Sequence, residues 1–340
     1  MPRFIDRLLA AKRWNTESFN LPPEMFERAD LLRARDALVR ADLRTATVLD
    51  IDNVAQYYFK HHTRTDGHMD GPEQFPQLAP PFPSAFYEYT LEPSMYDVMF
   101  TERERALPPV INQIGILVQS MDVGRFRDHF ANWGDFLQEQ RSDVPAKWVL
   151  FITVFAGHKA AREIRAPCTL LILAVGEDGQ ATSQLRCRIW GIEDECYELI
   201  PPERHVAIGS LGSLAFPAFL ATSFLHCRNV TTEENLPPAK LSKAHSRRHG
   251  QPLVRFKTLS IEPMKQVLRK QGHIDNHGLS QALHLCRGHF KDYRNSSGLF
   301  GKHKGLFWWD MHARGALDQG AVVKDYAIKL PESGDSLEYR

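Results

Sequence analysis

Apolar residues recur at helical spacing in two segments of the first half of the chain. From Leu21 to Leu43, apolar side chains stand three or four residues apart with charged residues between them, after an entrance at Pro22 and Pro23. This spacing places the apolar side chains on one side of a helix, and prolines suit its first turn. From Val123 to Gln140, aromatic residues follow a similar spacing. The pattern predicts two amphipathic helices.

Short apolar and β-branched runs predict the strands of the same half. A stretch rich in proline and glycine, His61 to Ser84, predicts the loop that precedes them. Glu177 to Gln180 predicts a hairpin turn that leads into a returning strand from Leu185 to Trp190. The other expected strands are Phe86–Leu91, Ile111–Gln119, Trp148–Phe155 and Thr169–Val175. We therefore expect an α+β first half, with residues 1–205 forming one acidic domain.

The second half combines one apolar helix with alternating strands. Leu211 to His226 is apolar throughout, which predicts a buried helix that Pro217 breaks. Beyond it, apolar and polar residues alternate with a period of two, as in strands with one buried face. The expected strands are Val254–Ile261, Leu283–Lys291, Leu306–Ala313 and Val322–Leu330. Short connections favour a four-stranded antiparallel sheet in a domain of residues 206–330, followed by a flexible tail, 331–340.

The composition is that of an ordinary globular protein. The chain has 340 residues, of which 43% are hydrophobic and 24% charged, and this excludes a disordered polyelectrolyte, a collagen-like chain and a disulfide scaffold. Its five cysteines contain no C-x-x-C pair, which argues against disulfides and a cysteine-built zinc site. No apolar run approaches ~18 residues, and charges stand where a signal peptide needs apolar residues, so we expect a cytoplasmic protein without membrane contact.

The net charge of +1 conceals an uneven distribution. Residues 238–329 hold 17 Lys and Arg against 6 Asp and Glu, which gives this segment a net charge of +11. The first 237 residues then carry −8, and the last 11 carry −2. A basic segment of this size is typical of a polyanion-binding surface. It would equally neutralise the acidic half across an internal interface.

Two of the expected strands hold a cluster of chemically capable side chains. With a period of two, Arg287, His289, Lys291 and Tyr293 share one face of their strand. Trp308, Asp310, His312 and Arg314 likewise share a face of theirs. A hairpin between the strands would bring both sets onto one surface, with the loop Lys302, His303 and Lys304 at its tip. So many cations together need an anion or solvent.

This set of residue types suits metal-independent cleavage of RNA, without a cofactor. His289 and His312 would act as general base and general acid on the 2′-hydroxyl and the leaving oxygen. Arg287, Lys291 and Arg314 would stabilise the charged phosphorane, and Tyr293 would position the substrate or assist proton transfer. RNA supplies the internal nucleophile that this chemistry requires.

The same surface would also serve a nucleic-acid-binding or phage-associated structural module without catalysis. Trp308 would stack on a base, and Lys302, His303 and Lys304 would contact phosphates. A basic loop with Lys243, Arg247 and Arg248 would form a second phosphate-contacting arm. RNA is the favoured partner, and a protein inhibitor or regulation by the first half is compatible with the same charge pattern. A solvated or interdomain face is the remaining interpretation.

The last third of the chain resembles an uncharacterised family of bacterial and prophage-borne proteins. The resemblance lies in Leu225–Val230, Gly250–Leu253, Arg287–Phe290, Leu299–Gly301 and His312–Gly315. It implies that these segments form one module, and it assigns no activity. At the level of fold, a helix with a four-stranded sheet that presents His, Arg, Lys and Tyr is similar to barnase, EndoU and RelE-type ribonucleases.

Overall fold

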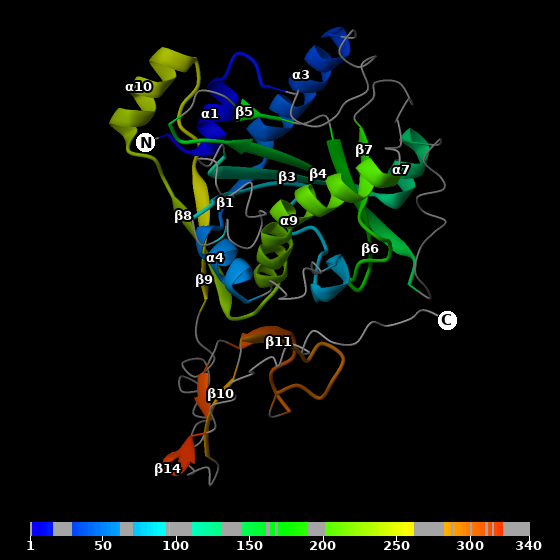
Figure 1. Cartoon of the computed structure of the whole chain (residues 1–340), viewed down its shortest axis with the longest axis vertical. Helices are drawn as coiled ribbons and strands as arrows, with labels where there is room; N and C mark the ends of the chain where they lie inside the picture. The colour runs from blue at the N-terminus through cyan, green and yellow to red at the C-terminus, as the bar shows by residue number, and fades with distance from the viewer. Residues whose placement is uncertain are drawn as a thin grey trace, which may run out of the picture. The chain divides into compact units, whose positions relative to one another are not determined.

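A computed structural model shows two compact units, residues 1–261 and 262–340, drawn from blue to yellow and from orange to red in Figure 1. The structure describes residues 2–15, 29–61, 71–92, 95, 111–130, 144–160, 164–166, 169–189, 201–261, 282–286, 288–299, 301–309, 312–314 and 316–321. Both helices and strands are well represented, so the fold class is α+β, as the sequence predicts.

The first unit is built on one mixed sheet with helices on both faces (Figure 1). Its strands run in the order β7-β6-β4-β3-β2-β1-β9-β8, with β5 paired to β4. Strands β2 and β9 both pair with β1 in parallel, and the other neighbours are antiparallel. The strands are β1 (Thr47–Asp50), β2 (Ser84–Thr90), β3 (Gln113–Asp122), β4 (Ala146–Gly157), β5 (Ile164–Arg165), β6 (Thr169–Gly176), β7 (Arg186–Ile189), β8 (Val230–Asn235) and β9 (Phe256–Ile261).

The helices fall into two layers because alternate residues of each strand point to opposite faces. Phe86 and Phe155 pack with α1 and α3 on one face, where Phe151 packs with α7. On the other face, the hydroxyl groups of Tyr87 and Tyr89 hydrogen-bond to α9, which also packs against α4. The helices are α1 (Phe4–Ala10), α3 (Ala29–Thr45), α4 (Asp52–His61), α7 (Val123–His129), α9 (Pro201–Leu225) and α10 (Ala239–His249).

Most predicted elements of the first half are confirmed within the described residues. The strands predicted at 86–91, 111–119, 148–155, 169–175 and 185–190 correspond to β2, β3, β4, β6 and β7. The two predicted amphipathic helices appear as α3 and α7, and residues 21–28 and 131–140 lie outside the described residues. The predicted loop begins after α4, and its described part, residues 71–83, contains one short 3-10 helix, Pro72–Gln74.

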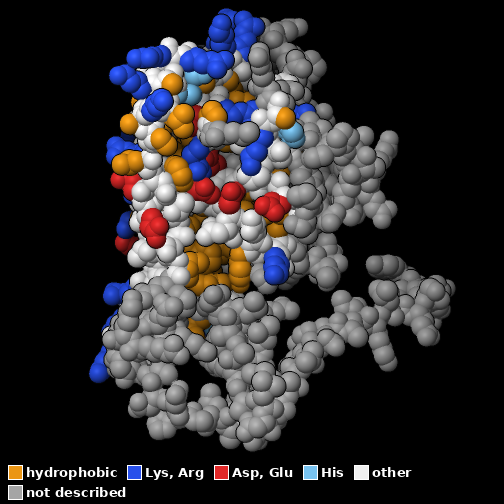
Figure 2. Space-filling model, turned by 90° about the vertical axis from the view of Figure 1, so that its left-hand side faces the viewer, with side chains coloured by type: hydrophobic (Ala, Val, Ile, Leu, Met, Phe, Trp, Pro, Cys, Tyr) orange, Lys and Arg blue, Asp and Glu red, His pale blue; other side chains and the backbone are white. Residues whose placement is uncertain are grey.

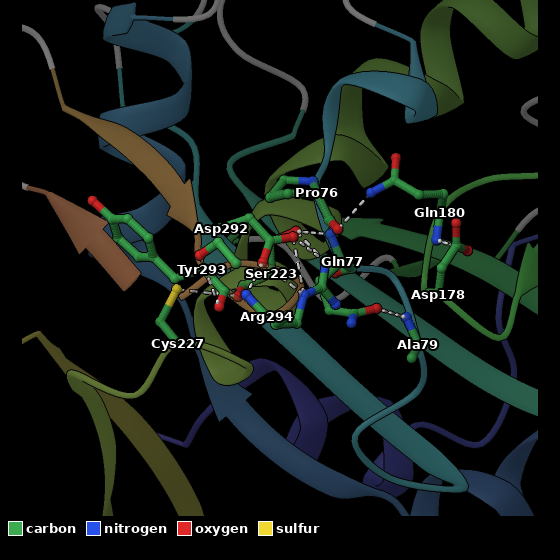
Figure 3. Close-up of polar contacts among 11 residues, drawn as sticks. Pro76, Gln77, Ala79, Asp178, Gln180, Ser223, Cys227, Asp292, Tyr293 and Arg294 are labelled. Carbon is green, nitrogen blue, oxygen red and sulfur yellow. Dashed lines mark hydrogen bonds and ion pairs between the residues drawn. The ribbon is translucent and has the colours of Figure 1, made fainter. Parts of the chain in front are cut away.

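Polar contacts hold the described part of this loop against other elements of the first unit (Figure 3). The Ser223 hydroxyl of α9 donates to the Gln77 carbonyl at 2.9 Å. The Gln180 side chain, in the turn after β6, donates to the Pro76 carbonyl at 2.7 Å. Buried backbone groups need such partners. The loop is therefore tied to both a helix and a hairpin turn.

The predicted break at Pro217 is wrong, because α9 runs unbroken through this residue. An interior proline costs a helix about 3 kcal/mol. Large apolar side chains on both sides of it are buried, among them Phe216, Phe219 and Phe224. Their burial, worth roughly 2 kcal/mol for each side chain, offsets the cost of the proline.

The division between the units lies at 261/262, whereas the sequence suggests 205/206. Strand β9 explains the difference, because it pairs with β1 in the middle of the first sheet and carries β8 with it. Helix α9 packs under the same sheet. The predicted strand at 254–261 therefore belongs to the first unit. The predicted basic loop with Lys243, Arg247 and Arg248 is wrong, since these residues form helix α10.

The second unit contains short strands in place of the predicted four-stranded antiparallel sheet. Both predicted strands 283–291 and 306–313 exist but are interrupted. The first becomes β10 (Ala282–Cys286) and β11 (His289–Asp292), and the second becomes β12 (Leu306–Trp309) and β13 (His312–Arg314). A further strand, β14 (Ala316–Ala321), pairs with β10 in parallel. Residues 322–340, with the predicted strand 322–330 and the predicted tail, lie outside the described residues.

Within the described part of the chain, every helix is too short or too polar to cross a membrane.

Candidate functional site

The predicted hairpin is present in the second unit as two antiparallel ladders. Strand β11 pairs with β12, with His289 opposite Trp309. Strand β10 pairs with β13, with Cys286 opposite His312. His289 lies three residues after Cys286 in the sequence, and its partner Trp309 lies three residues before His312, the partner of Cys286. The two ladders therefore have the same register.

The two histidines predicted for catalysis lie in different ladders. His289 is opposite Trp309 in the β11–β12 sheet, whereas His312 is opposite Cys286 in the β10–β13 ladder, which belongs to a separate sheet. Lys291 is on the same face of β11 as His289, and Arg314 is on β13 with His312. The predicted catalytic set is thus divided between two sheets.

Only part of that set has a described side chain. For His312 and Arg314 the structure describes the backbone, and Arg287 lies outside the described residues. His289 is exposed on β11, and Tyr293, at the end of this strand, is half-buried and packs against Phe307.

On the His289 face, a lysine and a tryptophan form one contact. The Nζ atom of Lys291 lies 4.2 Å from the centroid of the Trp309 ring. An ammonium group over an indole ring is stabilised by the ring quadrupole. Trp309 is half-buried and packs beside Phe307. This face therefore presents a cation and an aromatic ring side by side.

Trp308, the residue predicted to stack on a base, is on the other face and is only 3% exposed. Its ring packs edge-on against Phe290, with centroids 4.8 Å apart. A buried ring offers no surface to a base, and Trp309 is the less buried of the two tryptophans. The sequence allows either assignment, because alternation of adjacent tryptophans requires that one of them leaves the core.

The hairpin loop holds the predicted cations in a compact turn. The backbones of Leu299 and His303 bond to each other, and Gly298 adopts a φ of 90°, which favours glycine. Lys302 and Lys304 are exposed, and His303 is half-buried. No described acidic side chain pairs with Lys302 or Lys304. The loop therefore adds two solvent-facing cations to the hairpin.

One nearby acid has its own partner. The Asp292 carboxylate accepts hydrogen bonds from the Arg294 guanidinium, the shortest at 2.6 Å (Figure 3). The Arg294 hydrogen bonds lower the pKa of Asp292. The two charges cancel locally, so Asp292 leaves the lysine charges largely intact.

Lys243, Arg247 and Arg248, the predicted phosphate-contacting arm, lie in the first unit on helix α10. None of the residues of α10 is buried, and the helix ends at Gly250, whose φ is 77°. Residues 238–261 hold six Lys and Arg and no acid. Residues 262–340 hold 12 Lys and Arg against 9 Asp and Glu, a net charge of only +3. Much of the basic excess thus belongs to the first unit.

Helix α10 also borders a cleft that the sequence does not reveal. The cleft has a volume of about 1070 Å³. It is lined by α1, the carboxyl ends of β1 and β2, the starts of α4, β3 and β5, the residues that follow β4, and α10. Figure 2 shows this side of the first unit, with Lys and Arg gathered at one end and Asp and Glu next to them. Its volume is at the upper end of the range for ligand sites.

The floor of the cleft is an ion cluster around Arg3. The Arg3 guanidinium contacts the Glu88 carboxylate and lies 3.0 Å from Asp50 Oδ2. Glu88 also accepts the Ile5 N–H at 2.9 Å. Burial raises the pKa of Glu88 to about 7 despite the opposing effect of Arg3. Burial disfavours the charge of Arg3, but Glu88 and Asp50 raise its pKa above the usual value.

Two further aspartates complete this floor. Asp6 accepts the Val254 N–H at 2.8 Å and the Arg3 N–H at 3.1 Å. Asp52 Oδ1 accepts the Thr90 N–H at 2.5 Å. Burial raises the pKa of both aspartates above the usual value. The sequence gives little signal for either aspartate, because Asp6 lies within the seven-residue α1 and Asp52 follows the four-residue β1 at the start of α4.

No group of three or more His, Cys, Asp or Glu side chains within the described ranges is arranged to hold a metal ion.

Comparison with known proteins finds no matching family model, no similar curated protein and no similar solved structure.

Proposed function

We propose that the second unit binds single-stranded RNA, without cleaving it, through the hairpin face that carries His289 and Lys291 and through the loop 302–304. The observation that carries this proposal is the placement of Lys291 over Trp309 beside an exposed histidine. Single-stranded nucleic acid is bound by surfaces that pair cations for the phosphates with aromatic rings for the bases. Lys302 and Lys304 extend the cationic surface beyond the strand ends.

Binding fits the hairpin better than cleavage does. In metal-independent cleavage, a general base and a general acid act on the same phosphodiester, so both must reach it at once. His289 and His312 lie in ladders of separate sheets, and the side chain of His312 is outside the described part of the chain. The described face with Lys291 therefore offers a phosphate one imidazole, that of His289. Only RNA binding follows from the arrangement on a single face.

The test is a salt titration of a labelled single-stranded RNA with the full chain in EDTA. For single strands, the slope of log K against log[salt] changes by roughly 0.7 for each phosphate that the protein neutralises. We expect the double substitution Lys302→Ala/Lys304→Ala to lower the magnitude of the slope by about 1.4, and Lys291→Ala to weaken binding at every salt concentration. Lys147→Ala is the control, because Lys147 already pairs with Glu177 in the first unit at 2.7 Å.

Two results would contradict the proposal. An unchanged slope in the double variant would remove the hairpin from the interface. Cleavage in EDTA that disappears in both His289→Ala and His312→Ala would show that the two histidines cooperate, and it would establish the ribonuclease in place of the binding module. A single-stranded DNA of the same sequence measures the preference for the 2′-hydroxyl.

A further inference from the structure

In the cleft of the first unit, most carboxylates accept hydrogen bonds or ion pairs from the protein, whereas the lysines and arginines at the rim form no ion pair with a described acid. Glu88 and Asp50 share Arg3, and the Asp6 carboxylate accepts two backbone N–H groups. These three carboxylates stabilise α1 on the sheet, because each receives a donor from α1, from its N-cap or from the segment before β9. They consequently leave little negative charge for a ligand.

The rim of the cleft is cationic. Lys12 and Arg13 follow α1, Lys159 follows β4, and Arg248 projects from α10. All four side chains are exposed, and none of them forms an ion pair with an acidic residue that the structure describes. Lys159 lies near enough to Asp52 to oppose the rise in the pKa of that carboxyl group. The four cations belong to three separate elements around one opening. Cations gathered in this way, without direct ion pairs, favour an anionic ligand.

One acceptor in the floor is still available. Asp52 Oδ1 is occupied by Thr90, but no described donor reaches Asp52 Oδ2. Asp52 stands just beyond the carboxyl end of β1, which is parallel to both of its neighbours. Crevices at the carboxyl ends of parallel strands are common ligand sites in α/β sheets. A carboxylate oxygen there accepts hydrogen bonds from hydroxyl groups.

We propose that this cleft is a nucleotide-binding site, in which Lys159 and Arg248 hold the phosphates and Asp52 accepts a ribose hydroxyl. A cationic rim beside a single open carboxylate oxygen fits a ligand that joins a phosphate to a hydroxyl-bearing sugar. The volume of about 1070 Å³ accommodates a complete nucleotide and is far larger than an inorganic anion needs. This site lies in the first unit, so it does not rest on RNA binding by the hairpin.

The experiment is calorimetric titration of the full chain with the 5′-triphosphates of adenosine, guanosine, cytidine and uridine in EDTA. We expect at least one of them to bind more tightly than inorganic phosphate. Arg248→Ala and Lys159→Ala should each weaken that nucleotide by about tenfold or more, the loss typical of a charged hydrogen bond. Lys243→Ala is the matched control, because Lys243 is exposed on the same helix and does not line the cleft.

The ribose contact is tested separately with 2′-deoxy and 3′-deoxy analogues. At least one analogue should bind the wild type several-fold more weakly than the ribonucleotide, and Asp52→Asn should reduce that difference. The proposal fails if none of the four triphosphates binds more tightly than inorganic phosphate. It also fails if Arg248→Ala and Lys243→Ala lower affinity equally, or if both analogues match the ribonucleotide in the wild type. Loss of RNA binding in the hairpin variants affects none of these results.

Discussion

The buried carboxyl group of Glu88 should make the first unit less stable as the pH rises from about 4.5 to about 7. Glu88 is 5% exposed, and burial raises its pKa from 4.5 to about 7. An acid with a raised pKa binds its proton more tightly in the folded state than in the unfolded state. Its contribution to stability is therefore fully present below pH 4.5 and is lost as the pH rises through 7.

The magnitude follows from the size of this shift. One pKa unit corresponds to about 1.4 kcal/mol, so a shift from 4.5 to about 7 corresponds to about 3 kcal/mol of unfolding free energy. Other buried acids, such as Asp6 and Asp52, have pKa values raised in the same direction. The contribution of Glu88 is therefore isolated by comparing the wild type with Glu88→Gln, which keeps the shape of the side chain and does not titrate.

The assay is urea denaturation of the full chain between pH 4.5 and 8, followed by hydrogen exchange of the β2 and β3 amides, which report on the first unit. The unfolding free energy of the wild type should fall by about 3 kcal/mol more over this range than that of Glu88→Gln. Glu233→Gln, an exposed site on β8, should keep the wild-type dependence. The same pH dependence in wild type and Glu88→Gln would refute the argument that burial outweighs Arg3.

Three substitutions test the rest of the first unit by thermal and urea denaturation. Asp122→Ala removes the carboxylate that accepts the Gly124 N–H at the start of α7, and should cost about 1 kcal/mol. Gly179→Ala should cost at least about 1 kcal/mol, because φ is 83° and an added Cβ would lie 1.2 Å from Gln77 Oε1. Phe155→Ala should cost about 3–5 kcal/mol by opening a cavity in the core around α1, and a destabilisation below about 1 kcal/mol would contradict that packing.

The sequence predicts the elements whose apolar pattern is long. Strands β3 and β4 have 10 and 12 residues, and each contains a long buried stretch, so their patterns stand out. Strand β1 has only four residues, and β8 is polar and largely exposed, so neither gives a clear pattern. Helix α10 buries none of its residues and lacks an apolar stripe to detect. Its helical form depends on backbone preference and on the turn at Gly250.

The sequence predicted that the two strands of the candidate site pair as a hairpin, but it did not predict which side chains share one face of that hairpin. Alternation along each strand gives the set of residues on each face, and both strands are present. Which set of one strand joins which set of the other depends on register, and a slip of one residue exchanges the faces. The pairing of His289 with Trp309 therefore decides which side chains share the cationic face, and no local pattern encodes it. The choice between Trp308 and Trp309 depends on the same register.

The division of the chain also changes what the basic segment means. Six of its 17 cations lie between residues 238 and 261, and hence in the first unit, where α10 borders the cleft. The other 11 lie in the second unit, where acids reduce the net charge of residues 262–340 to +3. The single basic surface expected from the sequence is therefore replaced by one basic surface in each unit. Salt dependence measured on the full chain will sum both, so only substitutions confined to α10 or to the hairpin can assign each neutralised phosphate to its surface.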